Sequence, residues 1–203
     1  DLGQAMFFQH SITTLLAIRL PPTLLLMGMS ALFSIVISVP LSIWMAVDRG
    51  GVADVAVRSF NAIVQGTPLF FTAAVFIALF SLHYRIFPVA GYGETFGEHL
   101  ASLTLPALAV ALGIVPILVR SLRTALIDAL NSEYVNFAKS KGLGRRAIWL
   151  HYALKNASIT GISILGIQVG YLAGGSLVVE NVFAIPGMGT FLLQRHLPQT
   201  FPV

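Results

Sequence analysis

Residues Leu24 to Val47 read LLLMGMSALFSIVISVPLSIWMAV, an apolar run without a charged side chain. A helix of about 20 apolar residues crosses a bilayer, so this run is long enough to span one. Further runs follow at 62–82, 103–119 and 159–179. None has the alternating pattern of a barrel strand, and lipid offers no water to an open strand edge. The sequence therefore predicts an all-α integral membrane protein, a polytopic helical bundle with four clear spans.

The overall composition supports a single transmembrane domain over residues 1–203. The chain is 56% hydrophobic and 10% charged, and its mean hydropathy is +0.84, whereas soluble domains are about 25% charged. The absence of cysteine excludes disulfides, thiolate metal sites and a Cys nucleophile. Basic residues are sparse and none lies in an arm interleaved with aromatics, so a nucleic-acid partner is not expected.

The placement of charge orients the predicted spans. Of the twelve Lys and Arg residues, seven lie in the connection between the third and fourth runs, residues 120–157: Arg120, Arg123, Lys139, Lys141, Arg145, Arg146 and Lys155. By the positive-inside rule this loop is cytoplasmic. Arg49 and Arg58 fall on the same side by alternation, which places residues 1–22 outside. We therefore expect a multi-pass protein of the cytoplasmic (inner) membrane.

Within this loop, residues 133–156 read EYVNFAKSKGLGRRAIWLHYALKN. Apolar positions three and four apart, together with a cap at Asn131 or Ser132, predict a short helix that starts at Glu133. Gly142 should end that helix, and a second should begin near Arg145. Spacing alone leaves two alternatives open for the apolar stripe: a groove on another protein, or the lipid headgroups.

The loop also carries ten residues at fixed spacing: Tyr134, Val135, Ala138, Lys141, Gly142, Leu143, His151, Leu154, Asn156 and Ala157. This pattern resembles the cytoplasmic coupling loop of permease subunits in binding-protein-dependent ABC importers, specifically the oligopeptide, dipeptide and nickel group. Four other stretches are similar to the same group: LPPTLLL (20–26), FPVAGYG (87–93), LTLPALAVAL (103–112) and VENVFAIPGMG (179–189). The chain departs from the wider superfamily at residues 136–138 and 154–155, which lack a Glu-Ala-Ala start and a Leu-Pro end.

The resemblance implies the helical bundle of a type I ABC importer permease. Members of the group have one more span before this chain's first residue and another after its last, so we expect a piece of a six-span subunit. The implied function is a translocation pathway for peptides, related small solutes or nickel. The implied partners are ABC ATPase subunits, a second permease subunit, an extracytoplasmic solute-binding protein and the lipid bilayer.

The resemblance further implies that this chain is not an enzyme and binds no cofactor. ATP and Mg would be held by the partner ATPase subunit, and this chain has no phosphate loop. A lever at 133–141, a turn at 142–144 and a bracing helix at 145–154 would transmit ATPase closure to the spans. The residues expected at the ATPase contact are Glu133, Tyr134, Phe137, Ala138, Lys141, Gly142, Leu143, Arg145 and Arg146.

Individual roles follow from residue type. Tyr134 and Phe137 would be apolar anchors, and Ala138 would permit close approach to the partner. Lys141, Arg145 and Arg146 would contact the rim of the groove or, alternatively, lipid headgroups.

The fourth run carries glycines four residues apart, at Gly166, Gly170 and Gly174. Such spacing favours a tight helix seam, while Gln168 and Tyr171 are candidates for lining a pathway. Glu180 follows the run, and we expect its carboxylate to face water.

No metal site is expected, because the histidines (His10, His83, His99, His151 and His196) lack ligand spacing.

Two other classes of membrane protein remain as alternatives. A secondary, ion-coupled transporter would place ionisable residues inside its spans as relays, and the middles of these runs contain no Asp, Glu, Lys or His. An embedded hydrolase would need a base beside serines such as Ser34 and Ser38, and none lies at that depth. The sequence therefore favours the importer permease.

Overall fold

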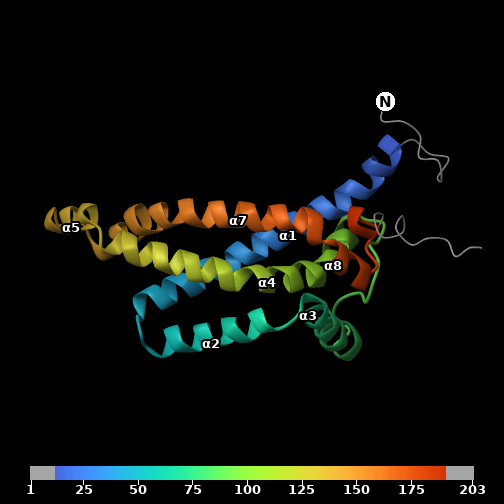
Figure 1. Ribbon diagram of the computed structural model, residues 1–203, viewed down its shortest axis with the longest axis horizontal. Coiled ribbons are helices and arrows are strands. Elements are labelled where there is room, and N and C mark those ends of the chain that lie inside the picture. The colour runs from blue at the N-terminus through green and yellow to red at the C-terminus, as the bar shows by residue number, and fades with distance from the viewer. Residues whose placement is uncertain (1–11, 191–203) are drawn as a thin grey trace, which may run out of the picture. The chain divides into compact units, whose positions relative to one another are not determined.

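The structure, a computed structural model, describes residues 12–190, and all regular structure in that range is helical (Figure 1). The elements are α1 (Ile12–Val47), α2 (Val52–Gly66), α3 (Leu69–Phe76), η1 (Ile77–His83), α4 (Phe96–Leu130), α5 (Glu133–Ser140), α6 (Arg145–Ala147), η2 (Ile148–Leu154), α7 (Lys155–Gly175) and α8 (Leu177–Val182), where η marks a π-helix. The predicted all-α class is confirmed. Two of the histidines, His10 and His196, and the chain end at 201–203 lie outside the described residues.

The prediction of four clear spans is wrong. Two described helices are long and apolar enough to cross a membrane, Ala17–Val47 within α1 and Phe96–Leu130. The pair formed by α2 and the α3–η1 run is long and apolar enough to cross a membrane only when the two parts are counted as one broken span. The fourth expected span falls in α7, which is not one of these two helices.

Proline explains where the second predicted span breaks. Pro68 follows Thr67, which is extended at φ −93° and ψ 128° and ends α2. The ring of a proline disfavours helical geometry in the residue before it. By contrast, Pro40, Pro106 and Pro116 lie inside the uninterrupted helices α1 and α4, as expected for prolines that a membrane bundle tolerates.

The described residues form two compact units, the first assembled from three segments of chain and the second from two. The first comprises residues up to Ser30, Pro68–Val110 and Tyr171 onward. In this unit α3 packs against α8, and the N–H of Gly91 donates a 3.0 Å hydrogen bond to the carbonyl of Phe183. Phe183 is 2% exposed, so the segment after α8 is anchored on buried side chains.

The second unit comprises Ala31–Thr67 and Ala111–Gly170. Its core is a row of leucines on α4, Leu118, Leu122 and Leu126, packed against alanines of η2 and α7. Small residues opposite large ones let helices approach closely. Beyond the ends of α4 and α7 lies α5 (Figure 1). This unit therefore contains the whole predicted coupling segment.

Candidate coupling site

The short helix predicted from Glu133 is present as α5, Glu133–Ser140. Ser132 occupies the N-cap position with extended backbone angles, but its side chain makes no capping hydrogen bond. Instead, its hydroxyl donates to the carbonyl of Ala129 at 2.5 Å. The predicted cap position is therefore right and the predicted cap interaction is wrong. Glu133 lies in the first turn, where the negative charge of its carboxylate interacts favourably with the positive end of the helix dipole.

Gly142 ends α5 in the left-handed conformation, with φ +76°, as predicted. Its N–H donates a 2.9 Å hydrogen bond to the carbonyl of Lys139, and the N–H of Leu143 donates a 3.2 Å hydrogen bond to the carbonyl of Ala138. These two bonds form a Schellman motif, which satisfies the last carbonyls of a helix. α5 therefore ends in a turn of defined geometry.

One face of α5 is buried by the chain itself. Val135 and Ala138 are 0% and 2% exposed and form a small apolar cluster with Ile148 of η2. The ring of Tyr134 stacks near that of Tyr152, with centroids 6.4 Å apart. This cluster corrects the expected role of Ala138, because its side chain faces η2 and is not available to a partner.

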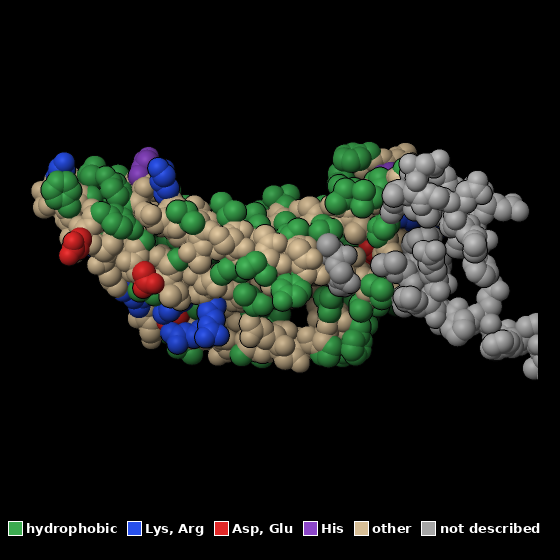
Figure 2. Space-filling model, turned by 45° about the horizontal axis from the view of Figure 1, so that its top comes forward, with side chains coloured by type: hydrophobic (Ala, Val, Ile, Leu, Met, Phe, Trp, Pro, Cys, Tyr) green, Lys and Arg blue, Asp and Glu red, His purple; other side chains and the backbone are tan. Residues whose placement is uncertain are grey.

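The rest of α5 is exposed and carries aromatic side chains among polar ones. Tyr134 is 40% exposed, Phe137 62% and the nearby Leu143 39%. The ammonium of Lys141 lies 4.4 Å from the centroid of the Phe137 ring, within cation–π range. Figure 2 shows hydrophobic and basic side chains side by side at the end that carries α5. Apart from Ala138, the residues predicted to contact an ATPase subunit are exposed.

The predicted coupling loop, 120–157, is largely helical, as expected for 133–141 and 145–154, and helix also covers residues 120–130. α4 continues to Leu130, while α6, η2 and α7 follow one another without a break from Arg145 to Gly175. The expected brace at 145–154 is therefore the first part of a longer helical run, part of it π-helical. A short helix held between two long ones is mechanically connected to both.

Two clefts include residues of α5 or of the turns that flank it. One, of about 580 Å³, includes Ser132 and Tyr134 in its wall. The other, of about 470 Å³, includes Lys139, Leu143 and Arg145. Because both clefts use residues of the predicted contact, a partner that covered α5 would also meet concave surface beside it.

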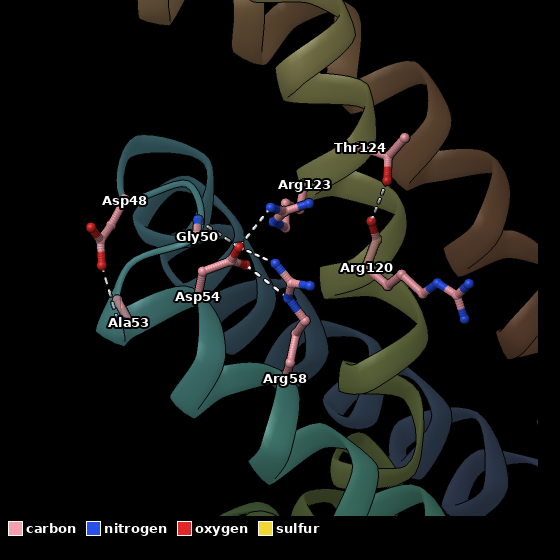
Figure 3. A network of polar contacts seen from close by, with 8 residues as sticks. All are labelled: Asp48, Gly50, Ala53, Asp54, Arg58, Arg120, Arg123 and Thr124. Atoms are coloured by element: carbon pink, nitrogen blue, oxygen red, sulfur yellow. Dashed lines mark hydrogen bonds and ion pairs between the residues drawn. The ribbon is translucent and has the colours of Figure 1, made fainter.

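Sequence reasoning missed a buried carboxylate at the start of α2 (Figure 3). Asp54 is 0% exposed and accepts a hydrogen bond from the N–H of Gly50 at 3.0 Å. It also pairs with Arg58 and with Arg123 of α4 at 2.7 Å. The carboxylate therefore joins the turn after α1 to both α2 and α4. An acid four residues before an arginine was the available signal, but Arg123 is distant in sequence.

Gly166 and Gly170 of α7, predicted to form a helix seam, make no close contact within this chain, because a Cβ added at either would meet nothing within 4 Å. The closely packed glycine is Gly161, where a Cβ would lie 2.7 Å from Leu122 Cδ2. Of the pathway candidates, Gln168 is half-buried and Tyr171 is 75% exposed. The surroundings of Gly174 lie outside the described part of the structure.

The expectation that Glu180 faces water is wrong. Glu180 of α8 is 0% exposed, and its carboxylate accepts hydrogen bonds from the hydroxyls of Thr23 at 2.7 Å and Ser176 at 3.0 Å. It also accepts from the backbone N–H groups of Gly189 at 2.7 Å and Thr190 at 3.1 Å. The segment ENVFAIPGMG therefore folds back around its own carboxylate, an arrangement that periodicity cannot show.

No group of three or more His, Asp or Glu side chains in residues 12–190 is placed to hold a metal ion.

Comparison with known proteins gives the same class as the sequence patterns. The family model described as "Binding-protein-dependent transport system inner membrane component" matches residues 38–203. A probable peptide ABC transporter permease of Sinorhizobium fredii is 28% identical over 206 residues, covering 100% of this chain and 66% of that protein. A putative peptide transport system permease of Brucella suis is 32% identical over 210 residues, again covering 100% of this chain and 66% of the relative.

The dipeptide transport system permease DppB of Bacillus subtilis is 33% identical over 178 residues, or 87% of this chain and 56% of that protein. Among solved structures, an inward-facing form of the MetNI methionine ABC transporter aligns with a TM-score of 0.72 at 18% identity, over 96% of this chain and 87% of that one. This likeness shows a shared fold. The chain thus spans 66% or less of the length of these curated relatives.

Proposed function

Because the chain belongs to the family of binding-protein-dependent transport system inner membrane components, we propose that it is the permease subunit of an ATP-driven importer. The chain is a multi-pass membrane protein, and in the proposal it lies in the cytoplasmic membrane with α5 on the cytoplasmic side. Peptides are the proposed cargo, because the relatives compared are named for peptides or dipeptides.

The observation that carries this proposal is the exposed apolar face of α5. A side chain such as Phe137, 62% exposed beside basic residues, is costly in water and typical of an interface that a partner covers. The opposite face of α5 is fixed by Val135 and Ala138 on η2. In the proposal the exposed face seats in an ATPase subunit that binds ATP and Mg, while a second permease subunit and a solute-binding protein complete the importer.

Rigid connection is what coupling requires. The Schellman turn at Gly142 fixes the angle between α5 and the helical run that begins at Arg145, so a displacement of α5 moves α7 as well. Rigid-body motion of packed helices is a common way to transmit such a change. Ala138 acts here by holding α5 on η2, while Tyr134, Phe137 and Leu143 make the contact.

The remaining predicted contacts are polar. Glu133, Lys141, Arg145 and Arg146 are exposed around the apolar patch, which suits the rim of an interface, where charges set orientation more than affinity. We keep Gln168 and Tyr171 of α7 as proposed pathway residues, and Gly166, Gly170 and Gly174 as positions where another helix can approach closely.

The test is co-purification of an ATP-hydrolysing subunit with the full-length permease in mild detergent. Phe137→Asp should abolish retention of that subunit, whereas Asn136→Asp, which adds the same charge at the neighbouring exposed position of α5, should retain it. Equal retention by both variants would contradict the proposed contact. Peptide uptake that persists without ATP and stops with a proton uncoupler would instead identify a secondary transporter.

A further inference from the structure

A third cleft in the unit that holds α5 lies between α2 and α4 and has a volume of about 390 Å³. Six polar residues line it: Arg58, Asn61, Gln65, Arg120, Arg123 and Thr124. The first three are spaced three and four apart on α2, so they form one polar row along that helix. A volume of this size is within the range of pockets that hold small ligands.

The cleft carries an excess of positive charge. Three of its lining residues are arginines, and the one carboxylate paired with them is Asp54, which contacts Arg58 and Arg123. Arg120 forms no ion pair among residues 12–190. Asp128, which lines a neighbouring cleft together with Arg120, is not within ion-pair distance of it. Arg120 is therefore the basic group available to an incoming anion.

The cleft also contains unpartnered hydrogen-bonding atoms. Asn61 is 8% exposed, and its Oδ1 has no hydrogen-bond partner. The Nε of Arg123 is likewise unpartnered. Buried polar groups in proteins are normally hydrogen-bonded, so these two enclosed atoms show that the chain's own hydrogen bonds do not fully satisfy the polar residues around the cleft.

We propose that this cleft is a binding site for the free carboxylate end of a peptide, with Arg120 as the principal charge partner. A planar guanidinium matches a carboxylate in a two-point contact. The amides of Asn61 and Gln65 meet the backbone groups of the same peptide. This assignment deepens the proposed function and rests on it, since it supposes that peptides pass along this chain.

An anionic lipid headgroup is the other source of an oxyanion in a membrane. Basic pockets between helices can bind such headgroups. A lipid phosphate, however, offers only acceptor oxygens, whereas the exposed amide of Gln65 presents both a donor and an acceptor, which match the N–H and C=O groups beside the carboxylate of a peptide. The row of amides on α2 therefore favours a peptide.

The experiment uses the full transporter, assembled from the full-length permease and its partner subunits, in phosphatidylcholine vesicles. The probes are the tripeptide alanyl-benzoylphenylalanyl-alanine and its C-terminal amide, cross-linked by light over a range of concentrations. The variants are Arg120→Gln, Arg120→Lys and, as the matched control, Arg85→Gln, which removes an exposed charge outside the cleft and outside the coupling site. Arg120→Gln breaks no side-chain contact that the structure shows.

The wild-type permease should label with the free acid at about tenfold lower concentration than with the amide, the effect of one charge-assisted contact. Arg120→Gln should remove this preference, Arg120→Lys should restore part of it, and Arg85→Gln should leave it intact. A preference unchanged in Arg120→Gln would overturn the proposal. Labelling insensitive to amidation but suppressed by added phosphatidylglycerol would also overturn it and would identify a lipid site.

ATP-driven uptake by the same vesicles separates the two proposals. If the wild-type transporter shows no ATP-driven uptake, the importer assignment fails whatever the cleft binds. If ATP-driven uptake is present but labelling ignores the carboxylate in every variant, the assignment of the cleft fails alone.

Discussion

Replacement of Glu180 is the change for which the structure gives the clearest magnitude. In Glu180→Ala the N–H groups of Gly189 and Thr190 lose their acceptor, and each buried donor left unpaired costs about 1–3 kcal/mol. The hydroxyls of Thr23 and Ser176 can rotate, so they add less. We expect the free energy of unfolding to fall by about 4 kcal/mol, which corresponds to a drop in Tm on the order of 10 °C.

Glu180→Gln should cost less, about 1–2 kcal/mol, because one oxygen remains for the two N–H groups and the new amide can face the hydroxyls. Thermal unfolding of the purified subunit in detergent measures both variants. Glu94→Ala is the control, since Glu94 is exposed in the same unit and should change little. Equal stability of Glu180→Ala and Glu94→Ala would refute the account of the carboxylate.

A double substitution tests the geometry directly. A Cβ at Gly187 would overlap the Glu180 carboxylate, and one at Gly189 would lie 2.9 Å from its Oε2. Gly187→Ala should therefore destabilise the wild type and be nearly neutral once Glu180 is alanine, with a coupling energy of about 1–3 kcal/mol. Strictly additive effects would show that the two residues do not touch.

Substitutions at three other positions, Gly142, Asp54 and Gly161, give expected outcomes. At Gly142, where φ is +76° and a Cβ meets nothing within 4 Å, Asn should be tolerated, Ala should cost about 1 kcal/mol and Val more; peptide uptake per ATP hydrolysed should fall in that order, and equal ratios would contradict a fixed turn. Asp54→Asn should lower the free energy of unfolding by roughly 2–3 kcal/mol by leaving Arg123 unpaired, with exposed Asp128→Asn as the neutral control in chemical unfolding. Gly161→Leu should cost about 1–3 kcal/mol through its contact with Leu122, whereas Gly166→Leu should leave the isolated subunit's Tm unchanged.

Local signals in the sequence predicted local structure well. The start of α5 at Glu133 and its end at Gly142 follow from a cap position, an apolar spacing and one glycine, all within ten residues. The boundaries of α1 and α4 were harder to predict, because an apolar run marks only the part of a helix that lies in lipid and not the polar turns beyond it. α4 continues beyond Val119, through Arg120 and Arg123, to Leu130.

Features that depend on contacts between distant residues were missed. The Asp54–Arg123 pair joins residues 69 apart, and the Glu180–Thr23 bond joins residues 157 apart. A lone carboxylate at a helix end most often faces water, and only the folded chain shows that four donors surround this one. Val135 was likewise part of a motif, but its burial against Ile148 depends on the return of the chain through η2.

The most direct test of the importer assignment is a cross-link from α5 to the ATPase subunit. Residues 1–203 contain no cysteine, so Phe137→Cys adds a single thiol to this part of the permease, and a thiol-to-amine reagent can then report its neighbour in the assembled transporter. The account predicts a cross-link between Phe137→Cys and the ATPase subunit, and none from Leu82→Cys, an exposed position (59%) in the other unit. A cross-link from Leu82→Cys alone, or labelling of Phe137→Cys from outside intact cells, would contradict it.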